Sequence, residues 1–181
     1  GSFRQQNVRE TWLPLVLGRL GLYLKPDFPA LQLMVGEILD AGGNPESANS
    51  MYRSISPDTP LGRMARFQIA TNMNRMGRFD EAVKIFRKIV KERPGWAEPL
   101  INLGDILRAN QRFEEAVVAY DQAFSALGEL EPRHWRLLYA RGIALERSGK
   151  WARAEADFLA ALVFEPDEPY VLNYLGYSWV E

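Results

Sequence analysis

Alanine recurs along this chain at a nearly fixed interval, and each occurrence is followed four residues later by an aromatic side chain. The recurring pairs are Ala48 with Tyr52, Ala82 with Phe86, Ala116 with Tyr120, and Ala154 with Phe158. The first three pairs are 34 residues apart, and the fourth follows after 38. A period of this length is typical of helical solenoids, in which each unit buries its apolar face against its neighbours. The interval therefore predicts a repeat array and not a single globular core.

A small residue stands twelve positions before each of these alanines. The small residues are Gly36, Ala70, Gly104 and Gly142, and Gly176 continues the series. The residue just before them is apolar at Val35, Ile69, Leu103 and Leu175, whereas Arg141 is the exception. Apolar positions three, four and seven residues apart form one stripe along a helix. Small residues in that stripe let two helices approach closely.

Turn-forming residues divide each unit into two helices. Seven positions after the small residue come Gly43, Gly77 and Gly149, with Gln111 in the remaining unit. Glycine there supplies the left-handed conformation that ends a helix. The units close on Pro60, Pro94 and Pro166, with Gly128 between them, and proline cannot continue a helix. Each unit is thus a first helix, a tight turn and a second helix, with about 13–15 residues in each helix.

This pattern resembles the tetratricopeptide repeat (TPR) family over residues 29–181. The resemblance implies an all-α fold, a right-handed αα-superhelix (TPR solenoid) of about four full helix-turn-helix units with partial units at both ends. A different αα-solenoid is the structural alternative. The segment 172–179 looks similar to bacterial members of the family.

The repeat register also suggests how the chain is divided. Units are expected near residues 29–62, 63–96, 97–134 and 135–168, followed by a half unit at 169–181. Residues 3–28 are expected to form an N-terminal helical segment, the end of a preceding repeat, which Pro14 kinks or starts. Residues 1–2 look like a scar left by removal of a tag. Because the half unit lacks its second helix, we expect the sequence to be a segment of a longer protein.

The unit at 97–134 is four residues longer than its neighbours, and the surplus lies within residues 125–132. Four residues make about one helical turn, roughly 6 Å of rise. One interpretation is a longer second helix followed by a looser loop. The other is a protruding contact or a break in the superhelix.

The composition argues against catalysis. The chain has no cysteine, one histidine at His134 and a formal net charge of −1. It has no His pair for zinc and no phosphate-binding or nucleophile motif, so we expect no enzyme activity, no metal and no cofactor. Acidic pairs at helix starts are explained by the helix dipole, and His134 is interpreted as structural or idle. No apolar run reaches 18 residues, so we expect a soluble segment without a membrane span, cytoplasmic or periplasmic.

In the TPR family the first helices line a concave groove that takes peptides. The resemblance carries this groove onto Gln68, Thr71, Asn74, Arg75, Asn102, Asp105, Arg108, Arg136, Tyr139, Arg147, Asn173, Tyr174 and Tyr177. Leu33, Met34, Glu37 and Glu146 fall at further groove positions. Amides can donate to and accept from a peptide backbone, arginine can pair with a carboxylate, and tyrosine offers contact area at low entropic cost. A solvated polar helix face is the alternative interpretation.

One TPR subgroup grips a C-terminal carboxylate through Lys and Asn at fixed groove positions. Asn102 fits that set and Arg136 is similar, but Phe67, Thr71 and Ala140 do not match it. The sequence therefore argues against a clamp for chaperone tails.

Charge is distributed unevenly. Residues 63–93 hold nine basic and three acidic residues, and residues 94–131 hold two basic and seven acidic. An outward stripe on one second helix carries Lys84, Arg87, Lys88 and Lys91. One interpretation is complementarity between adjacent units together with solubility. The other is a docking ridge for an acidic partner; nucleic acid is not expected, because the neighbouring acidic unit would repel phosphates.

These observations favour a noncatalytic protein–protein interaction scaffold, which binds a partner protein or an extended peptide in the concave groove. The alternative is a structural or self-assembly spacer within a larger multidomain protein. The apolar half unit at 169–181 predicts self-association through the C-terminal end.

Overall fold

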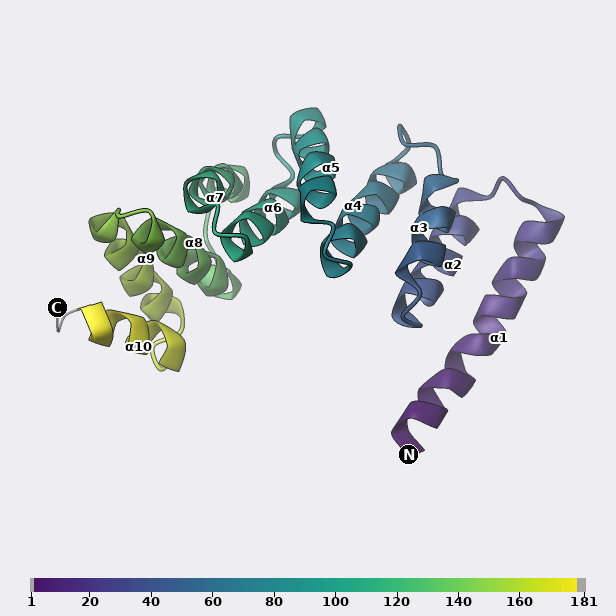
Figure 1. Ribbon diagram of the computed structural model, residues 1–181, viewed down its shortest axis with the longest axis horizontal. Coiled ribbons are helices and arrows are strands. Elements are labelled where there is room, and N and C mark those ends of the chain that lie inside the picture. Colours follow the sequence, from purple (N-terminus) through teal and green to yellow (C-terminus); the bar gives the residue numbers. More distant parts are fainter. Residues whose placement is uncertain (1, 179–181) are drawn as a thin grey trace. The chain divides into compact units, whose positions relative to one another are not determined.

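The computed structural model describes the backbone of residues 2–178 and the side-chain environment of residues 12–176 (Figure 1). Within these residues the chain is helical throughout and has no strand, which confirms the all-α fold class. The elements are α1 (Ser2–Leu24), α2 (Pro29–Ala41), α3 (Pro45–Arg53), α4 (Pro60–Arg75), α5 (Phe79–Glu92), α6 (Ala97–Ala109), α7 (Phe113–Leu127), the 3-10 helix η1 (Pro132–His134), α8 (Trp135–Arg147), α9 (Trp151–Phe164) and α10 (Pro169–Ser178).

The chain divides within α5 into two compact units, one ending at Ile85 and the other beginning at Phe86. In the first unit, α2 packs on α1, α3 and α4, and α3 packs on α4. Gly36 of α2 lies under the Tyr52 ring of α3, where an added Cβ would overlap that ring. The small position and the aromatic residue sixteen places on therefore form the contact that joins the two helices.

The first unit begins with α1, and Pro14 lies inside this helix. Of the two expectations for Pro14, a start of the helix is therefore wrong. α1 approaches α2 through two glycines: an added Cβ would lie 2.6 Å from Val35 Cγ2 at Gly18 and 2.6 Å from Leu31 Cδ2 at Gly21. These glycines allow the close approach of the two helices.

The first unit also contains a chain of polar contacts. Arg75 of α4 pairs with Asp40 of α2 at 3.0 Å. The amide nitrogen of buried Asn72, oriented to satisfy its neighbours, lies 3.0 and 3.2 Å from the two carboxylate oxygens of Asp40. In that orientation its oxygen lies 3.1 Å from Oδ1 of buried Asn49, so a hydrogen bond between the two requires the Asn49 amide to be turned as well. The chain thereby links α2, α3 and α4.

The second unit repeats the same helix pair twice. α6 packs on α7 and α8 packs on α9, while α7 packs on α8 and α9 on α10. An added Cβ would lie 2.5 Å from the Tyr120 ring at Gly104 and 2.5 Å from the Phe158 ring at Gly142. Nothing lies within 4 Å of an added Cβ at Gly176, which occupies the same repeat position in α10. The glycine is therefore sterically required where the aromatic residue of a second helix packs against it.

Left-handed residues end the first helix of each pair, as the turn pattern predicts. Gly43, Gly77 and Gly149 have φ values of 77°, 75° and 74°. Gln111 occupies the same position with φ 59°, and it is the non-glycine residue with positive φ within the described backbone. The turn geometry is thus kept even where the glycine is missing.

The four surplus residues of the 97–134 segment go mainly into a connection. α7 has 15 residues, one more than α9, and ends at Leu127. Gly128, with φ 70°, turns the chain, and η1 then leads into α8. The expectation of a longer second helix accounts for only one residue, because Gly128 adopts a conformation that no helix continues.

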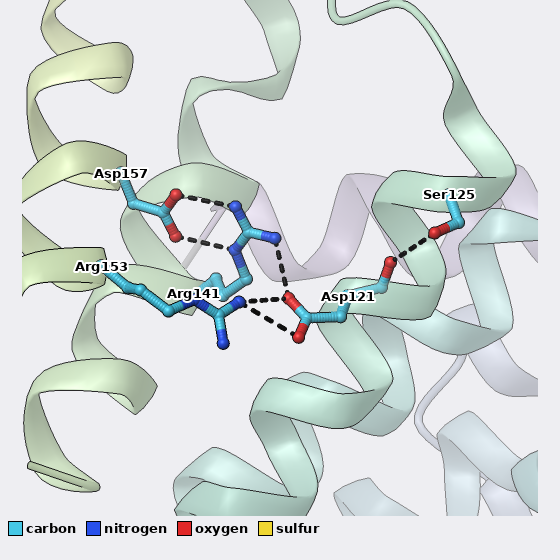
Figure 2. A network of polar contacts seen from close by, with 5 residues as sticks. All are labelled: Asp121, Ser125, Arg141, Arg153 and Asp157. Carbon is cyan, nitrogen blue, oxygen red and sulfur yellow. Dashed lines mark hydrogen bonds and ion pairs between the residues drawn. The ribbon is translucent and has the colours of Figure 1, made fainter. Parts of the chain in front are cut away.

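Arg141, the exception to the apolar pattern, occupies the centre of a polar network (Figure 2). Its guanidinium donates to both carboxylate oxygens of Asp157 at 2.7 Å and to Asp121 at 2.8 Å. It also lies over the Phe124 ring, 3.9 Å from the centroid. Arg153 donates to Asp121 at 3.0 Å. The network ties α7, α8 and α9 together across successive repeats.

Candidate functional site

A hollow of about 440 Å³ lies between α6 and α8, the first helices of two successive repeats. Its lining from α6 includes Ile101, Asp105 and Arg108, and η1 and α8 form the remaining walls. Arg136 and Tyr139 line it from α8. Four residues predicted from the repeat register (Asp105, Arg108, Arg136 and Tyr139) therefore lie around one hollow.

Apolar and aromatic side chains account for much of this lining. Ile101, Ala140 and Ile143 contribute aliphatic surface. The rings of Trp135 and Tyr139 lie 6.5 Å apart and tilted by 46°. The hollow thus combines apolar surface with polar groups, the usual composition of a binding site.

Three arginines line the hollow in different states, and one of them, Arg133, pairs with Glu131 at 3.0 Å. Arg136 is exposed, and its guanidinium carbon lies 5.2 Å from the centroid of the Trp135 ring. Arg108 is half-buried, and its Nε donates to the hydroxyl of Tyr120 at 3.2 Å. Its NH2 group lies 3.6 Å from Asp105. Arg136 is therefore the more available cation, and part of the donor capacity of Arg108 is already used inside the fold.

Tyr120 joins the hollow to the helix pair behind it. Its hydroxyl donates to Asp105 at 2.7 Å. Burial raises the pKa of the Tyr120 phenol, and the charge of Asp105 raises it further, so the hydroxyl stays protonated and remains a donor. Asp105 and Arg108 thus line the hollow and also take part in packing, which the repeat register alone does not reveal.

His134 lines the hollow as well, and sequence analysis interpreted it only as structural or idle. Its Nδ1 accepts a hydrogen bond from the backbone N–H of Glu131 at 2.9 Å, which closes a capping box around η1. A neutral histidine that accepts at Nδ1 carries its proton on Nε2. The structural role is therefore present. The sequence signal for this cap is the Glu-x-x-His spacing of Glu131 and His134.

The predicted groove residues of the first unit lie on α4. Gln68, Thr71 and Asn74 are partly exposed, and the hydroxyl of Thr71 donates to the carbonyl of Phe67 at 3.1 Å. Arg75 is exposed at one edge but pairs with Asp40.

The remaining predicted residues of the second unit are dispersed. Asn102 donates to the carbonyl of Glu98 at 2.9 Å, and Arg147 pairs with Glu146 at 3.3 Å. Asn173 is exposed on α10. Tyr174 packs edge-on against Tyr139, with ring centroids 5.9 Å apart. The side chain of Tyr177 lies outside the described residues.

The described residues contain no group of three or more His, Cys, Asp and Glu side chains that could hold a metal ion. No described helix is both long enough and apolar enough to cross a membrane.

A family model for the tetratricopeptide repeat matches residues 74–126 and 101–169, which together make up just over half of the chain. A TPR repeat-containing protein of Pseudomonas aeruginosa is 30% identical over 150 residues, 82% of this chain and 25% of that protein. The general transcriptional corepressor ssn6 of Schizosaccharomyces pombe is 27% identical over 135 residues, 75% of this chain and 12% of that protein. The chain therefore spans a quarter or less of the length of these relatives.

Solved structures share the same fold at low sequence identity. MamA from Desulfovibrio magneticus superposes with a TM-score of 0.73 at 19% identity, over 83% of this chain and 83% of that chain. YrrB, described as a TPR protein with an unusual peptide-binding site, has a TM-score of 0.71 at 15% identity over 94% and 86% of the two chains. PilW, a type IV pilus biogenesis factor, has a TM-score of 0.74 at 15% identity over 87% and 72%. At these identities the likeness concerns the fold alone.

Proposed function

The chain belongs to the tetratricopeptide repeat family, whose members are generally noncatalytic scaffolds for protein–protein interaction, and we propose that it binds an extended segment of a partner protein in the hollow between α6 and α8. This hollow is the part of the predicted groove in which several groove positions surround one depression.

The observation that carries the proposal is the mixed lining of this hollow. A polar helix face that only contacts water does not need the aliphatic wall formed by Ile101, Ala140 and Ile143. A peptide could place an apolar side chain against that wall while Arg136 pairs with a carboxylate nearby. Aromatic and arginine side chains often dominate the energetics of such interfaces, and Tyr139 and Arg136 are of these types. YrrB, a structural neighbour, is itself described as having a peptide-binding site.

The test places a photo-crosslinking amino acid at position 136 and, as a control, at position 147. Arg147 is exposed and does not line the hollow. We expect crosslinking at position 136, but not at 147, to join the chain to a discrete partner that mass spectrometry identifies.

The peptide from that partner is then titrated against variants of the chain. Arg136→Glu should weaken binding by about tenfold, since it replaces an attractive charge by a repulsive one, whereas Arg147→Glu should leave the affinity unchanged. Arg108→Ala is a poor probe, because Arg108 also holds Tyr120. Equal effects at positions 136 and 147 would contradict a site in the hollow.

A further inference from the structure

On the second-helix side of the second unit, α5 and α7 form an open groove away from the hollow between α6 and α8. Two adjoining depressions of about 730 and 320 Å³ make it up. They share Val90 and Lys91 of α5 and Val118 and Gln122 of α7. We call this surface the α5–α7 groove. On α7 its lining runs from Glu115 to Ala126, a rise of about 16 Å, which would accommodate three turns of a helix or about five extended residues.

Val118 gives the groove an apolar contact that the repeat itself does not require. Its side chain is 57% exposed. The equivalent positions in the other repeats carry Ser50, Lys84 and Ala156, so stacking of the units needs no large apolar residue here. An exposed valine beside Val90 therefore offers a surface that an aliphatic side chain from outside can cover.

The two carboxylates in the groove are already neutralised by arginines. Glu115 pairs with Arg87, and it accepts two hydrogen bonds from Arg112 at 2.7 and 2.8 Å. Asp121 is held by Arg141 at 2.8 Å and by Arg153 at 3.0 Å (Figure 2). Each acidic group thus has two cationic partners, and neither presents an uncompensated negative charge to a ligand.

Lys91, by contrast, is exposed and forms no ion pair with any described residue. Lys88 lies three residues earlier on the same face of α5 and is exposed as well. The groove therefore has a positive excess on its α5 side, whereas Arg87 of the same basic stripe is engaged by Glu115.

Gln122 supplies the third element of recognition. It is exposed, and its amide has no partner among the described residues. A free primary amide can donate to and accept from a peptide backbone. A phosphate backbone could not use the exposed valine, so a protein ligand suits this lining better than a nucleic acid.

From Val118, Lys91 and Gln122 we infer that the α5–α7 groove is a second interaction surface, which takes an acidic segment of a partner protein bearing an aliphatic side chain. The aliphatic side chain packs between Val90 and Val118. A carboxylate beside it pairs with Lys91, and the backbone contacts Gln122. This surface does not depend on the hollow between α6 and α8.

The probe is a fluorescein-labelled peptide of about twelve residues, in which two leucines one helical turn apart are surrounded by glutamates. Two companion peptides replace the glutamates by lysines or the leucines by serines. Binding to the whole chain is followed by fluorescence anisotropy. We expect the acidic leucine peptide to bind and both companions to bind at least tenfold more weakly.

Variants of the chain locate the binding. Val118→Ser installs the residue found at position 50 and should weaken binding about fivefold, and Lys91→Glu should weaken it about tenfold. Lys84→Glu is the matched control, because it makes the same charge change on the same helix at a position that does not line the groove. Circular dichroism shows whether each variant remains folded.

Results of three kinds would overturn the inference. One is equal binding of the lysine-substituted peptide. Another is an effect of Lys84→Glu as large as that of Lys91→Glu, or no effect of Val118→Ser, since either would mean general charge attraction. The third is Lys91-dependent binding of duplex DNA or of phosphatidylserine vesicles in the absence of peptide binding, which would assign the surface to another class of macromolecule.

Discussion

Arg141 and Asp157 show how a charged pair can replace an apolar pair without loss of the repeat. Arg141 and Asp157 are sixteen residues apart. In the other units the equivalent pairs of positions are apolar: Val35 with Met51, Ile69 with Ile85, and Leu103 with Ala119. In the last full unit the side chains of Arg141 and Asp157 are 18% and 8% exposed and joined by two hydrogen bonds. A buried pair of this kind is strongly destabilised when only one partner is removed, because the other charge is left unpaired.

We therefore predict strong coupling between substitutions at the two positions. Arg141→Leu should lower the free energy of unfolding by about 3 kcal/mol, and Asp157→Ala by about 1 kcal/mol, since Arg141 keeps Asp121. The double variant, which recreates the pair at Leu103 and Ala119, should lie within about 1 kcal/mol of the natural sequence.

Urea denaturation followed by circular dichroism measures all three variants. Additive losses in the double variant would show that the two residues do not act as a pair. Arg153→Leu is a useful comparison, because its contact with Asp121 is more exposed and its loss should cost about 0–1 kcal/mol.

Gln111 allows a second test at the scale of one residue. It holds φ 59° at a turn where three other units have glycine. A left-handed conformation costs a non-glycine residue about 1–2 kcal/mol, and glycine loses part of that gain to the entropy of the unfolded chain. Gln111→Gly should therefore raise the free energy of unfolding by about 0.5–1 kcal/mol, and the melting temperature with it. The reverse change, Gly149→Gln, should lower the free energy of unfolding and the melting temperature. If Gln111→Gly instead lowered the stability, the glutamine would have a contact that compensates for its backbone conformation.

At the scale of the helix pair, the contact between a glycine and an aromatic ring sets how closely two helices approach. Gly104 faces Tyr120 and Gly142 faces Phe158 at distances that exclude a methyl group. Gly176 stands at the same repeat position but meets no such ring. The same substitution should therefore have opposite effects at the two kinds of site.

Gly104→Ala should destabilise the chain by about 1–2 kcal/mol, since overpacking a core contact outweighs the gain in helix propensity. Gly176→Ala should instead stabilise α10 by about 0.5–1 kcal/mol, because only the propensity changes. Thermal unfolding of the two variants measures both changes in stability. If both changes were stabilising, the packing of Gly104 against Tyr120 would not limit the distance between the helices.

On the scale of the whole chain, apolar side chains remain exposed on the helices nearest the two termini. Tyr170 and Leu172 of α10 are 70% and 47% exposed. α1 exposes Trp12, Leu13, Val16, Leu17, Leu20, Tyr23 and Leu24. At about 100° per residue these seven side chains of α1 span an arc of roughly 140°, opposite its glycine contact with α2.

Self-association through the C-terminal helix accordingly stays a prediction, and α1 provides its natural control. Sedimentation velocity over a hundredfold range of concentration should show an increase in the average sedimentation coefficient. Leu172→Glu should abolish that increase, because it places a charge in the apolar contact, whereas Leu20→Glu on α1 should leave it unchanged. A constant sedimentation coefficient would contradict self-association. If Leu20→Glu abolished the increase and Leu172→Glu did not, the contact between copies would lie on α1.

The helical organisation could be predicted largely from spacing. Gly36 lies against Tyr52, and Gly104 against Tyr120, as the sixteen-residue interval implies. The division into repeats and the N-terminal segment at 3–28 rests on the register and stays a proposal. The four-residue surplus forms a slightly longer second helix and a loop, as one interpretation had it, but the division between them depends on the conformation of Gly128 and on the cap made by His134.

The candidate site was less predictable. The register brought Asp105, Arg108, Arg136 and Tyr139 to one hollow, but it did not distinguish the exposed Arg136 from Arg108, which is bonded to Tyr120. It also gave no sign that Val118 would be exposed beside a free lysine.

The sequence by itself determined that the chain is built of paired helices, where the turn within each pair falls and which small and aromatic side chains pack together; it did not give the length of every helix, since α3 has 9 residues where about 13–15 were expected. Those properties follow from spacing within one repeat, where the pitch of the helix places the residues. Only the tertiary structure decided which polar side chains are already bonded and which are free. Partners such as Arg153 and Asp121 lie 32 residues apart, and their contact depends on how successive helices pack, which no single period encodes.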